Sequence, residues 1–546
     1  MITEKGPGQP ASPGSPQGSE GVGPPGGEGG APDGAAPPSA PGAVRTVRRV
    51  ARNSVVPFAA NLVGRAVAIV LAVVMARTLG ASGTGLYAVA VNLWLYASIV
   101  ADFGLGTWLT REVARLAGAQ QRTQARQTVA DALGLRLILS ALALPLLLVA
   151  GLIAGLVQGS GPDGVLLATL ALLGVGLLPG AVSAAGTALF NAYEEMTFPA
   201  AVQLGTAVVT TGAGATLLLL GYDVVALGWV SLLVNLATAA VFAVACARRF
   251  FPLSAHLRPA RQLALAREAL PLMLNGLLNN VFFRFDVQVL QSKGTAAVGY
   301  YANAYKVIDA AGAVPSSFVL ALFPLLARRA ASDEGAGGAG AGVGRVYRLA
   351  TKLLIATALA IAVPVTYLAG DLVLWLWGPD FLPDSAIALA ILIWFLPLSF
   401  FNGLTQYVLI AIGRQSRITL AFVVAALFNV GANLLLIPRY GYVAAAVVTI
   451  ASEVVLLVPF LVALRGRIAA WPVLAAALRP VPAAAAVGVV LLFGRDVAEP
   501  WRLLLAVATT AVYPVLLLVS GVFDPGERRL IQGLLPARLR GWLPAG

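Results

Sequence analysis

The chain has 546 residues, of which 59% are hydrophobic and only 11% are charged, and its mean hydropathy is +0.85. Soluble domains carry about 25% charged residues, so this composition indicates a protein of the lipid bilayer. One cysteine excludes a disulfide framework, and one histidine excludes a multi-histidine metal site. The sequence also lacks a phosphate-loop motif and a nucleophile elbow. We therefore expect neither an enzyme nor a bound cofactor.

Residues 1–44 are dominated by Gly, Pro, Ser and Ala. Such a segment cannot bury enough apolar surface to offset the entropy lost on ordering. It has no apolar core of the kind that a cleavable signal peptide requires. We interpret it as a disordered cytoplasmic tail.

Fourteen apolar runs follow, each long enough to span a bilayer, which takes about 20 helical residues. They cover residues 55–77, 86–110, 129–157, 165–190, 198–220, 223–247, 270–291, 297–324, 350–370, 385–411, 418–437, 441–464, 473–494 and 502–521. Short polar breaks separate them, so neighbouring helices are expected to be antiparallel. The predicted fold class is an all-α integral membrane protein with about 14 transmembrane helices.

The basic residues between these runs divide unevenly between the two sides of the membrane. One side receives 25 arginines, and the other holds only Arg77, Lys293, Arg439, Arg495 and Arg502. Cytoplasmic loops carry the excess of Lys and Arg, so both termini are predicted to be cytoplasmic. The same rule explains the formal net charge of +13, and nucleic acid is not an expected partner.

Two halves of the chain resemble each other at an offset of 214 residues. Gly85 and Tyr87 in LGASGTGLYAVA match Gly299 and Tyr301 in KGTAAVGYYANA when gaps near the first glycine are allowed. Six helices in each half predict two lobes related as parallel repeats, an arrangement typical of secondary transporters. The predicted divisions are an N-lobe (45–250), a C-lobe (251–466), two extra helices (467–523) and a basic cytoplasmic tail (524–546).

Two stretches resemble a known family: RTLGASGTGLYAVAVNLWLYASIVADFGLGTWLTREVAR (77–115) and NLLLIPRYGYVAAAVVTIASEVV (433–455). They are similar to the polysaccharide transporter branch of the multidrug/oligosaccharidyl-lipid/polysaccharide flippase superfamily, which includes the O-antigen and teichoic-acid flippases. The resemblance implies two six-helix lobes around a central cavity, often with two extra helices, and a lipid-linked sugar as cargo. Lipid II flippases share the fold.

Few ionisable side chains lie inside the predicted spans, where a charge is costly unless it is paired or faces water. Arg65 stands near the middle of the first run, and the resemblance implies that this helix lines the cavity. An arginine fork can bind a diphosphate bidentately. Arg65 is therefore predicted to bind substrate, with pairing to a neighbouring helix as the alternative.

A second group of charges lies on the seventh and eighth runs, which are antiparallel around a short turn. Arg284 and Asp286 precede the turn, and Lys306 and Asp309 follow it at similar depth. Lys306 and Asp309 share a helix face because they are three residues apart. We expect Asp286 to pair with Lys306 and Arg284 with Asp309, in the outer half of the membrane, with some of the charges facing a hydrated cavity.

Further roles follow from residue type and position. The substrate-binding candidates carry a cation or an amide that could contact phosphate or sugar hydroxyls: Arg65, Arg284, Lys306, Asn61, Asn275 and Asn279. Contact between helices explains the amides equally well. Three buried carboxylates could bind H⁺ or Na⁺ as the coupling ion: Asp286, Asp309 and Glu453. Three residues at the cytoplasmic end of the second run could form a gate or a headgroup contact: Asp102, Arg111 and Arg115.

These features favour a secondary transporter that flips a polyprenyl-diphosphate-linked oligosaccharide across the cytoplasmic membrane for polysaccharide biosynthesis. Membrane lipids and glycan assembly enzymes are the expected partners. Two alternatives stay open: an organic-cation antiporter of the same superfamily and a lipid II flippase. The cations Arg65, Arg284 and Lys306 favour an anionic cargo over an organic cation.

Overall fold

The computed structural model describes residues 40–528 apart from 158–160, 162 and 336–339. Two units are distinguished, residues 1–51 and residues 52–546. In the first unit only the start of α1 is described, and all that follows concerns the second. The predicted tail 1–44 lies outside the described residues up to position 39, and α1 begins at Ala40. Most of the basic tail, residues 529–546, also lies outside them.

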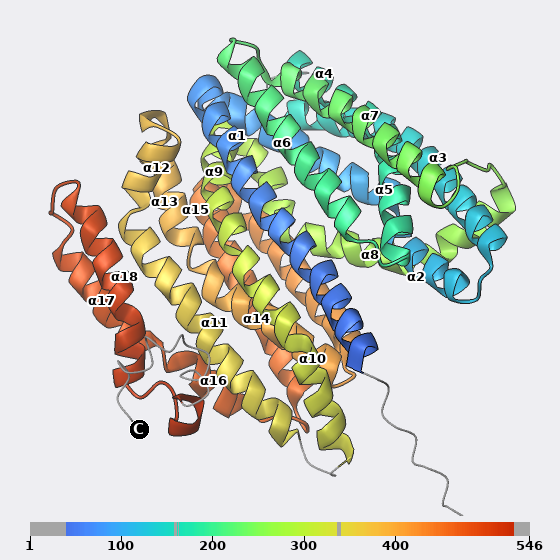
Figure 1. The fold of residues 1–546 in the computed structure, drawn as a ribbon. Coiled ribbons are helices and arrows are strands. Elements are labelled where there is room, and N and C mark those ends of the chain that lie inside the picture. Colours follow the sequence, from blue (N-terminus) through green and yellow to red (C-terminus); the bar gives the residue numbers. More distant parts are fainter. Residues whose placement is uncertain (1–39, 158–160, 162, 336–339, 529–546) are drawn as a thin grey trace, which may run out of the picture. The chain divides into compact units, whose positions relative to one another are not determined.

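The described residues of the second unit are helical and fall into an N-terminal bundle, a C-terminal bundle and a final group of three helices (Figure 1). The N-terminal bundle contains α1 (Ala40–Asp102), α2 (Leu105–Gly118), α3 (Arg122–Val157), α4 (Gly164–Val175), α5 (Leu177–Ala192), α6 (Thr197–Leu219) and α7 (Val224–Arg249). The C-terminal bundle contains α8 (Pro259–Leu290), α9 (Thr295–Ala311), α10 (Ala313–Gly335), α11 (Ala341–Tyr367), α12 (Ala369–Leu376), α13 (Asp384–Leu392), α14 (Phe395–Ala411) and α15 (Gln415–Leu464). The final group contains α16 (Ala470–Leu478), α17 (Val481–Phe493) and α18 (Trp501–Val519).

Two helices, α1 and α15, each contain two of the predicted runs. The backbone leaves the helical conformation at Gly80 (φ 65°) in α1 and at Gly441 (φ 61°) in α15. Side chains with a Cβ rarely adopt such positive φ angles, so glycine serves these bends. Through the second bend the two ends of α15 become neighbours: Arg414 at one end donates a hydrogen bond to the carbonyl oxygen of Arg465 at the other, 2.8 Å away.

Ten helical stretches in the described residues are long and apolar enough to cross a membrane. Two of them hold two predicted runs each: Val56–Gly118, which covers α1 from Val56 onward together with α2, and Gln415–Leu464, which is the whole of α15. The remaining predicted runs, 270–291 and 297–324, lie in α8 and in α9–α10, which are not among the ten. These are the helices that carry Arg284, Asp286, Lys306 and Asp309. The fold class predicted from sequence is confirmed, and twelve of the fourteen predicted runs lie in these ten stretches.

Both bundles pack around close helix pairs. In the N-terminal bundle α5 packs against α2, α3 and α7, and in the C-terminal bundle α15 packs against α8 and α14. The final helices cover α11. The first part of α8 instead meets α2 and α3, where Leu265 and Ala269 join the buried core of the N-terminal bundle.

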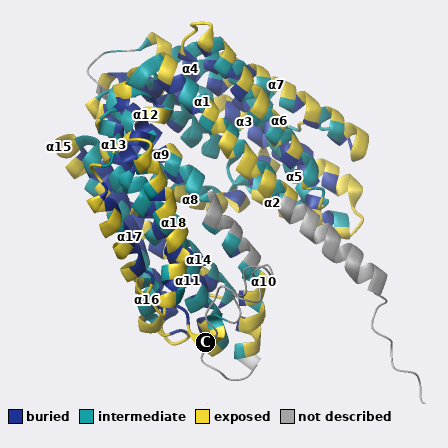
Figure 2. Ribbon diagram, turned by 60° about the vertical axis from the view of Figure 1, so that its left-hand side comes forward, coloured by how far each residue is buried: buried dark blue, intermediate teal, exposed yellow. Residues whose placement is uncertain are grey.

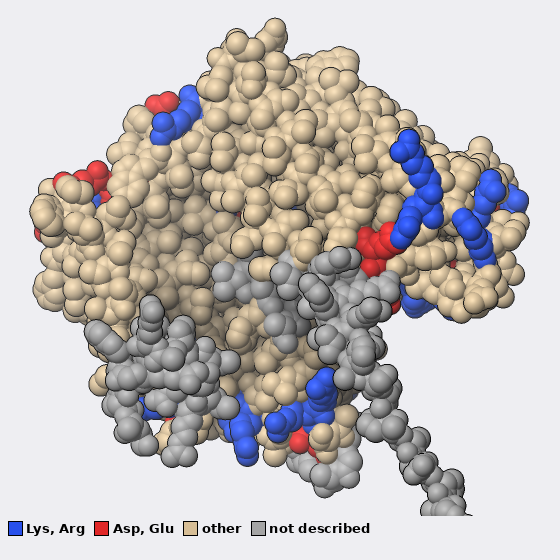
Figure 3. Space-filling view, in the orientation of Figure 1, with Lys and Arg blue, Asp and Glu red and all other residues tan. Residues whose placement is uncertain are grey.

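The exposed surface around the outside of the second unit is largely apolar. Exposed residues mark the outer sides of the helices in Figure 2, and they include Leu146, Leu427, Leu435 and Phe493. In Figure 3 charged atoms gather toward the edges of the visible face and leave a wide uncharged area between them. Such a surface suits contact with lipid chains. Together with the helix lengths, it identifies a multi-pass membrane protein.

The loops predicted to face outward come together at one end of this unit. Arg77 donates to the carbonyl of Leu376 (3.3 Å), Tyr442 to Asp384 (2.5 Å) and Tyr367 to the carbonyl of Gly494 (2.7 Å). The arginine-rich ends of α10, α11 and α15 point the other way (Figure 1). For the loops that these contacts join, the grouping agrees with the prediction, whereas the side that faces the cytoplasm stays a prediction.

Candidate functional site

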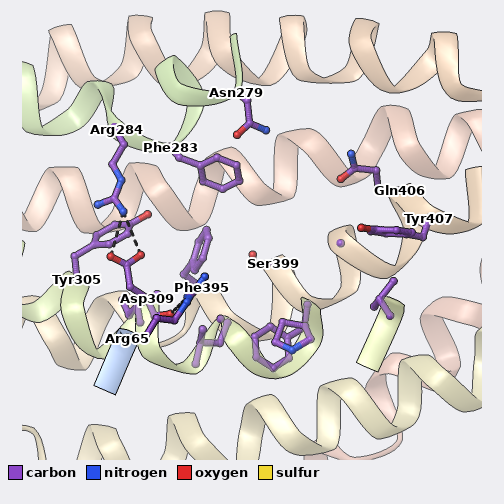
Figure 4. Close-up of a pocket in the computed structure, with 17 residues that line it drawn as sticks. Arg65, Asn279, Phe283, Arg284, Tyr305, Asp309, Phe395, Ser399, Gln406 and Tyr407 are labelled. Atoms are coloured by element: carbon purple, nitrogen blue, oxygen red, sulfur yellow. Dashed lines mark hydrogen bonds and ion pairs between the residues drawn. The ribbon is translucent and has the colours of Figure 1, made fainter. Parts of the chain in front are cut away.

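A pocket of about 530 Å³ is lined by α1, α8, α9, α10 and α14 (Figure 4). Arg65 is its one contribution from α1, and the other lining residues belong to the C-terminal bundle. Its guanidinium forms no ion pair with a carboxylate among the described residues. Nε donates to Asn61 Oδ1 (3.0 Å), and Nη1 donates to the backbone carbonyl of Asp309. Arg65 therefore reaches the pocket with its positive charge uncompensated by an ion pair among the described residues.

Arg284 and Asp309 form an ion pair on the wall of this pocket. Arg284 Nη2 lies 3.1 Å from Asp309 Oδ2 and 3.2 Å from Oδ1, and the guanidinium carbon stands 4.7 Å from the centre of the Tyr305 ring. The Arg284 guanidinium is thus held by both the Tyr305 ring and the Asp309 carboxylate (Figure 4). The predicted pairing of Arg284 with Asp309 is found in the structure.

The predicted pairing of Asp286 with Lys306 is wrong. Lys306 lines a neighbouring pocket of about 300 Å³, which shares Arg284, Tyr305 and Asp309 with the first. Arg284 and Asp286 are two residues apart, so they point to different sides of α8. Because Arg284 faces Asp309, Asp286 faces away from the side of α9 that carries Lys306.

Asp286 is instead buried in a hydroxyl cluster. Tyr301 donates its phenol proton to Asp286 Oδ2, and Thr449 Oγ1 lies 3.4 Å from the same oxygen. The backbone N–H of Val287 donates to the other carboxylate oxygen at 2.8 Å. The hydroxyl oxygens of Tyr301 and Thr449 are 3.2 Å apart. These contacts join α8, α9 and α15 at one point.

Glu453 is another buried carboxylate of the C-terminal bundle. Asn402 of α14 donates to its Oε2 (2.6 Å) and to its backbone carbonyl (2.8 Å), whereas Oε1 has no hydrogen-bond partner among the described residues. Nearby, Asn433 donates to Asn429 (2.9 Å) and Asn429 to Ser452 (2.9 Å). A buried oxygen without a partner is costly, so this carboxylate is a candidate for taking up a proton or a cation.

The predicted asparagines lie in different surroundings. Asn279 lines the 530 Å³ pocket beside Phe283 (Figure 4), and Asn61 accepts the bond from Arg65. Asn275 is exposed and lines none of the described pockets named above. Of the three, only Asn279 lines this pocket, and Asn61 is linked to it through Arg65.

The three candidate gate residues are not brought together. Asp102 forms an ion pair with the buried Arg136 inside the N-terminal bundle, beside a pocket of about 420 Å³. Arg115 pairs with Glu112 at 2.6 Å, one turn away on the same helix. Arg111 is exposed. The first pair joins α1 to α3 and the second lies within α2, and the gating role stays a prediction.

The pocket also contains residues that the search for charges missed. Tyr305, Phe395 and Tyr407 give it aromatic walls, and Ser399 and Gln406 add neutral polar groups (Figure 4). Neutral polar residues inside apolar helices were the available signal, since such residues mark functional surfaces in membrane proteins as charged ones do. No group of three or more His, Cys, Asp and Glu that could hold a metal ion was found among the described residues.

The sequence matches the family described as polysaccharide biosynthesis protein over residues 50–329, just over half of the chain. The fold is that of an all-helical, multi-pass membrane protein. The chain belongs to the polysaccharide biosynthesis protein family. The comparison with curated proteins gave no match.

Solved structures with the same fold come from two groups of transporters. The lipid II flippase MurJ in an inward closed conformation aligns with a TM-score of 0.67 at 12% identity, over 88% of this chain and 100% of that one. An inward-facing multidrug resistance MATE family transporter of the MOP superfamily gives 0.58 at 18% identity, covering 73% and 93%. A MATE transporter from Vibrio cholerae gives 0.51 at 17% identity, covering 77% and 98%. At these identities the likeness concerns the fold.

Proposed function

We propose that this protein is a flippase that carries a polyprenyl-diphosphate-linked oligosaccharide across the cytoplasmic membrane. The observation that carries the proposal is the charge of the two adjoining pockets. Arg65, Arg284 and Lys306 line them against the single carboxylate of Asp309. A diphosphate would neutralise the excess cations and gain charge-assisted hydrogen bonds.

The cargo would divide between the surfaces that the pocket offers. Phosphate oxygens would bind Arg65, whose guanidinium is held by Asn61 but is not neutralised. Sugar rings would stack on Tyr305 or Tyr407 and bond to Asn279 and Gln406, which line the same space. Glycan assembly enzymes that deliver the cargo are the partners that this function requires.

The alternative cargo classes predict different linings. An organic cation would be favoured by a pocket in which carboxylates outnumber cations, and here the reverse holds. Lipid II carries the same polyprenyl diphosphate, so the charge of the pocket does not separate it from other lipid-linked glycans. The two cargoes are distinguished by measuring transport in reconstituted vesicles that contain either lipid II or an undecaprenyl-diphosphate oligosaccharide.

The deciding experiment removes the charge of Arg65. Arg65→Ala should reduce transport in reconstituted vesicles by at least about tenfold, the effect of losing one charge-assisted contact of about 1.5 kcal/mol. Arg65→Lys should recover part of it, since a point charge lacks the planar fork. Arg248→Ala, at the exposed end of α7, is the control. Normal transport by folded Arg65→Ala would contradict the proposed role.

Coupling to an ion gradient is assigned to Glu453 as its first candidate. Glu453→Gln retains a partner for Asn402 but cannot bind H⁺ or Na⁺ as a carboxylate does. The variant should fold normally and should lose the acceleration of transport by a proton or sodium gradient. Asp286→Asn is the comparison, because that carboxylate is already satisfied by hydroxyls and a backbone N–H. An unchanged gradient response in the Glu453 variant would rule out this assignment.

A further inference from the structure

A basic pocket of about 480 Å³ lies where the two ends of α15 meet. Its polar lining consists of Arg414, Ser416, Arg417 and Arg465. The bend at Gly441 folds α15 back on itself, so these residues come from positions nearly fifty residues apart and still face one space. The pocket is separate from the one that contains Arg65, with which it shares no residue.

Arg414 is the fixed part of this pocket. Its Nη1 donates to the carbonyls of Ala463 and Arg465 at the C-terminal end of α15, and Gly413 before it has a φ of 72°. The guanidinium thus satisfies carbonyls that the helix end leaves without partners. Arg414 thereby joins the two ends of α15 and positions Arg417 and Arg465 around the opening.

The other donors of the pocket have no anionic partner. Its lining contains no Asp or Glu, and the exposed side chains of Arg417 and Arg465 make no ion pair among the described residues. The N-terminus of α15 has no side-chain cap at Arg414. The C-terminal end of α15, with opposite partial charge, lies at the same place and is capped by Arg414, so the helix ends alone do not select an anion. The attraction for an anion therefore comes from three arginines that have no carboxylate among the residues lining the pocket.

The surroundings of the pocket are apolar on the lipid side. Val462 lines the pocket and is 47% exposed, and Leu420 and Val458 along α15 are also exposed. A phosphate held by the arginines would therefore sit at the boundary between polar headgroups and acyl chains. A phosphodiester with attached chains fits this boundary better than a free ion.

We propose that this pocket is a phosphate-binding site, which takes the phosphodiester of an anionic lipid at the end of α15. Arginine is suited to this chemistry because its planar fork meets two phosphate oxygens at once. The bound phosphate would link the two ends of α15 beyond the contact that Arg414 already makes. This site does not depend on the cargo proposed above.

The test uses the full-length protein in detergent with lipid added back, and native mass spectrometry to count bound lipid. Dioleoylphosphatidylglycerol, dioleoylphosphatidylcholine and inorganic phosphate are the three probes. Arg417→Ala combined with Arg465→Ala should weaken phosphatidylglycerol binding by roughly tenfold or more, since charge-assisted contacts are lost. Arg417→Lys should weaken it less.

A matched pair of substitutions separates a site from general attraction to anions. Arg248→Ala combined with Arg258→Ala removes the same charge from exposed positions outside the pocket and should leave binding within about twofold. Equal loss in both pairs, or no loss in either, would overturn the proposal. Competition by millimolar inorganic phosphate would identify free phosphate as the source, and its absence with retained preference for phosphatidylglycerol would identify the lipid. Arg417→Gln provides a milder variant if the double variant fails to fold.

Discussion

Gly85 in α1 and Gly299 in α9 lie against each other, and they hold the same place in the two halves of the sequence repeat. A Cβ on Gly85 would clash with the carbonyl oxygen of Thr295 and lie 2.9 Å from the nitrogen of Gly299. A Cβ on Gly299 would clash with the carbonyl oxygen of Ala81 and lie 3.2 Å from the nitrogen of Gly85. The backbones of α1 and α9 therefore meet at a point where both repeats need a residue without a side chain.

Alanine at either glycine should keep α1 and α9 apart. Gly85→Ala and Gly299→Ala should each expose the buried Thr84 beside this contact and destabilise the packing of α1 against α9 by about 1–3 kcal/mol, as overpacking does. The measurement is labelling of a cysteine at position 84, with Cys246 replaced. Gly64→Ala, whose Cβ would lie at an ordinary 3.9 Å from Ala207, is the control. Unchanged labelling in both variants would show that this glycine contact does not hold α1 against α9.

The hydroxyl cluster around Asp286 should behave as one energetic unit. Tyr301→Phe and Thr449→Val each remove a hydrogen bond from the carboxylate and should cost about 1–2 kcal/mol of stability, the range for polar contacts in membrane bundles. The loss of unfolding free energy in the double variant should differ from the sum of the losses in the two single variants, because both groups share Asp286 and contact each other.

Thermal unfolding in detergent measures this coupling. Thr357→Val is the matched control, since Thr357 bonds only to the carbonyl of Leu353 in its own helix. Lys306→Gln should leave the unfolding temperature unchanged, because Lys306 makes no ion pair with Asp286 among the described residues. Strict additivity of the two cluster variants would refute a shared network.

A pH-dependent contribution to stability is expected beyond the end of α18. Partial burial of Asp524 raises the pKa of its carboxyl, but the hydrogen bond from Arg479 and the charge of Lys352 outweigh it and hold that pKa below its usual value. The ion pairs therefore stabilise the fold above the unfolded pKa of about 3.9. This contribution is lost as the pH falls through the lower folded pKa.

Asp524→Asn tests this expectation. Wild type should lose stability relative to the variant as the pH is lowered from 5 toward 3, and the two should differ by a constant amount between pH 5 and 8. The difference should be small because the Asp524 side chain is 60% exposed and solvent screens the pairs. A difference that grows above pH 6 would contradict this account. Unfolding curves across the pH range provide the measurement.

The sequence predicted the helices well because apolar runs of fixed length have few alternatives in a bilayer. It also predicted the Arg284–Asp309 pair, since helix length fixes depth. Depth alone did not determine the direction of a side chain around the helix axis, and so Asp286 was assigned to Lys306 in error. Its actual partner Thr449 lies 163 residues further along the chain.

The aromatic and amide lining of the pocket was beyond prediction for a related reason. Tyr305, Phe395 and Tyr407 stand in helices where aromatic residues also serve for packing and lipid contact. Asn402 of α14 donates a hydrogen bond to Glu453 of α15, and the two residues are 51 positions apart in the sequence. Nothing in the local sequence distinguishes such residues from their neighbours until the packing of α14 and α15 is known.

The position of Thr449 has a consequence for the order in which the protein is assembled during translation. The ribosome makes α8 long before α15, so the carboxylate of Asp286 enters the membrane when its α15 partner does not yet exist. Tyr301 follows within 15 residues and can shield the carboxylate early. The C-terminal bundle therefore stays incomplete, with α8 and α9 paired as a hairpin, until α15 has been synthesised and packs against them.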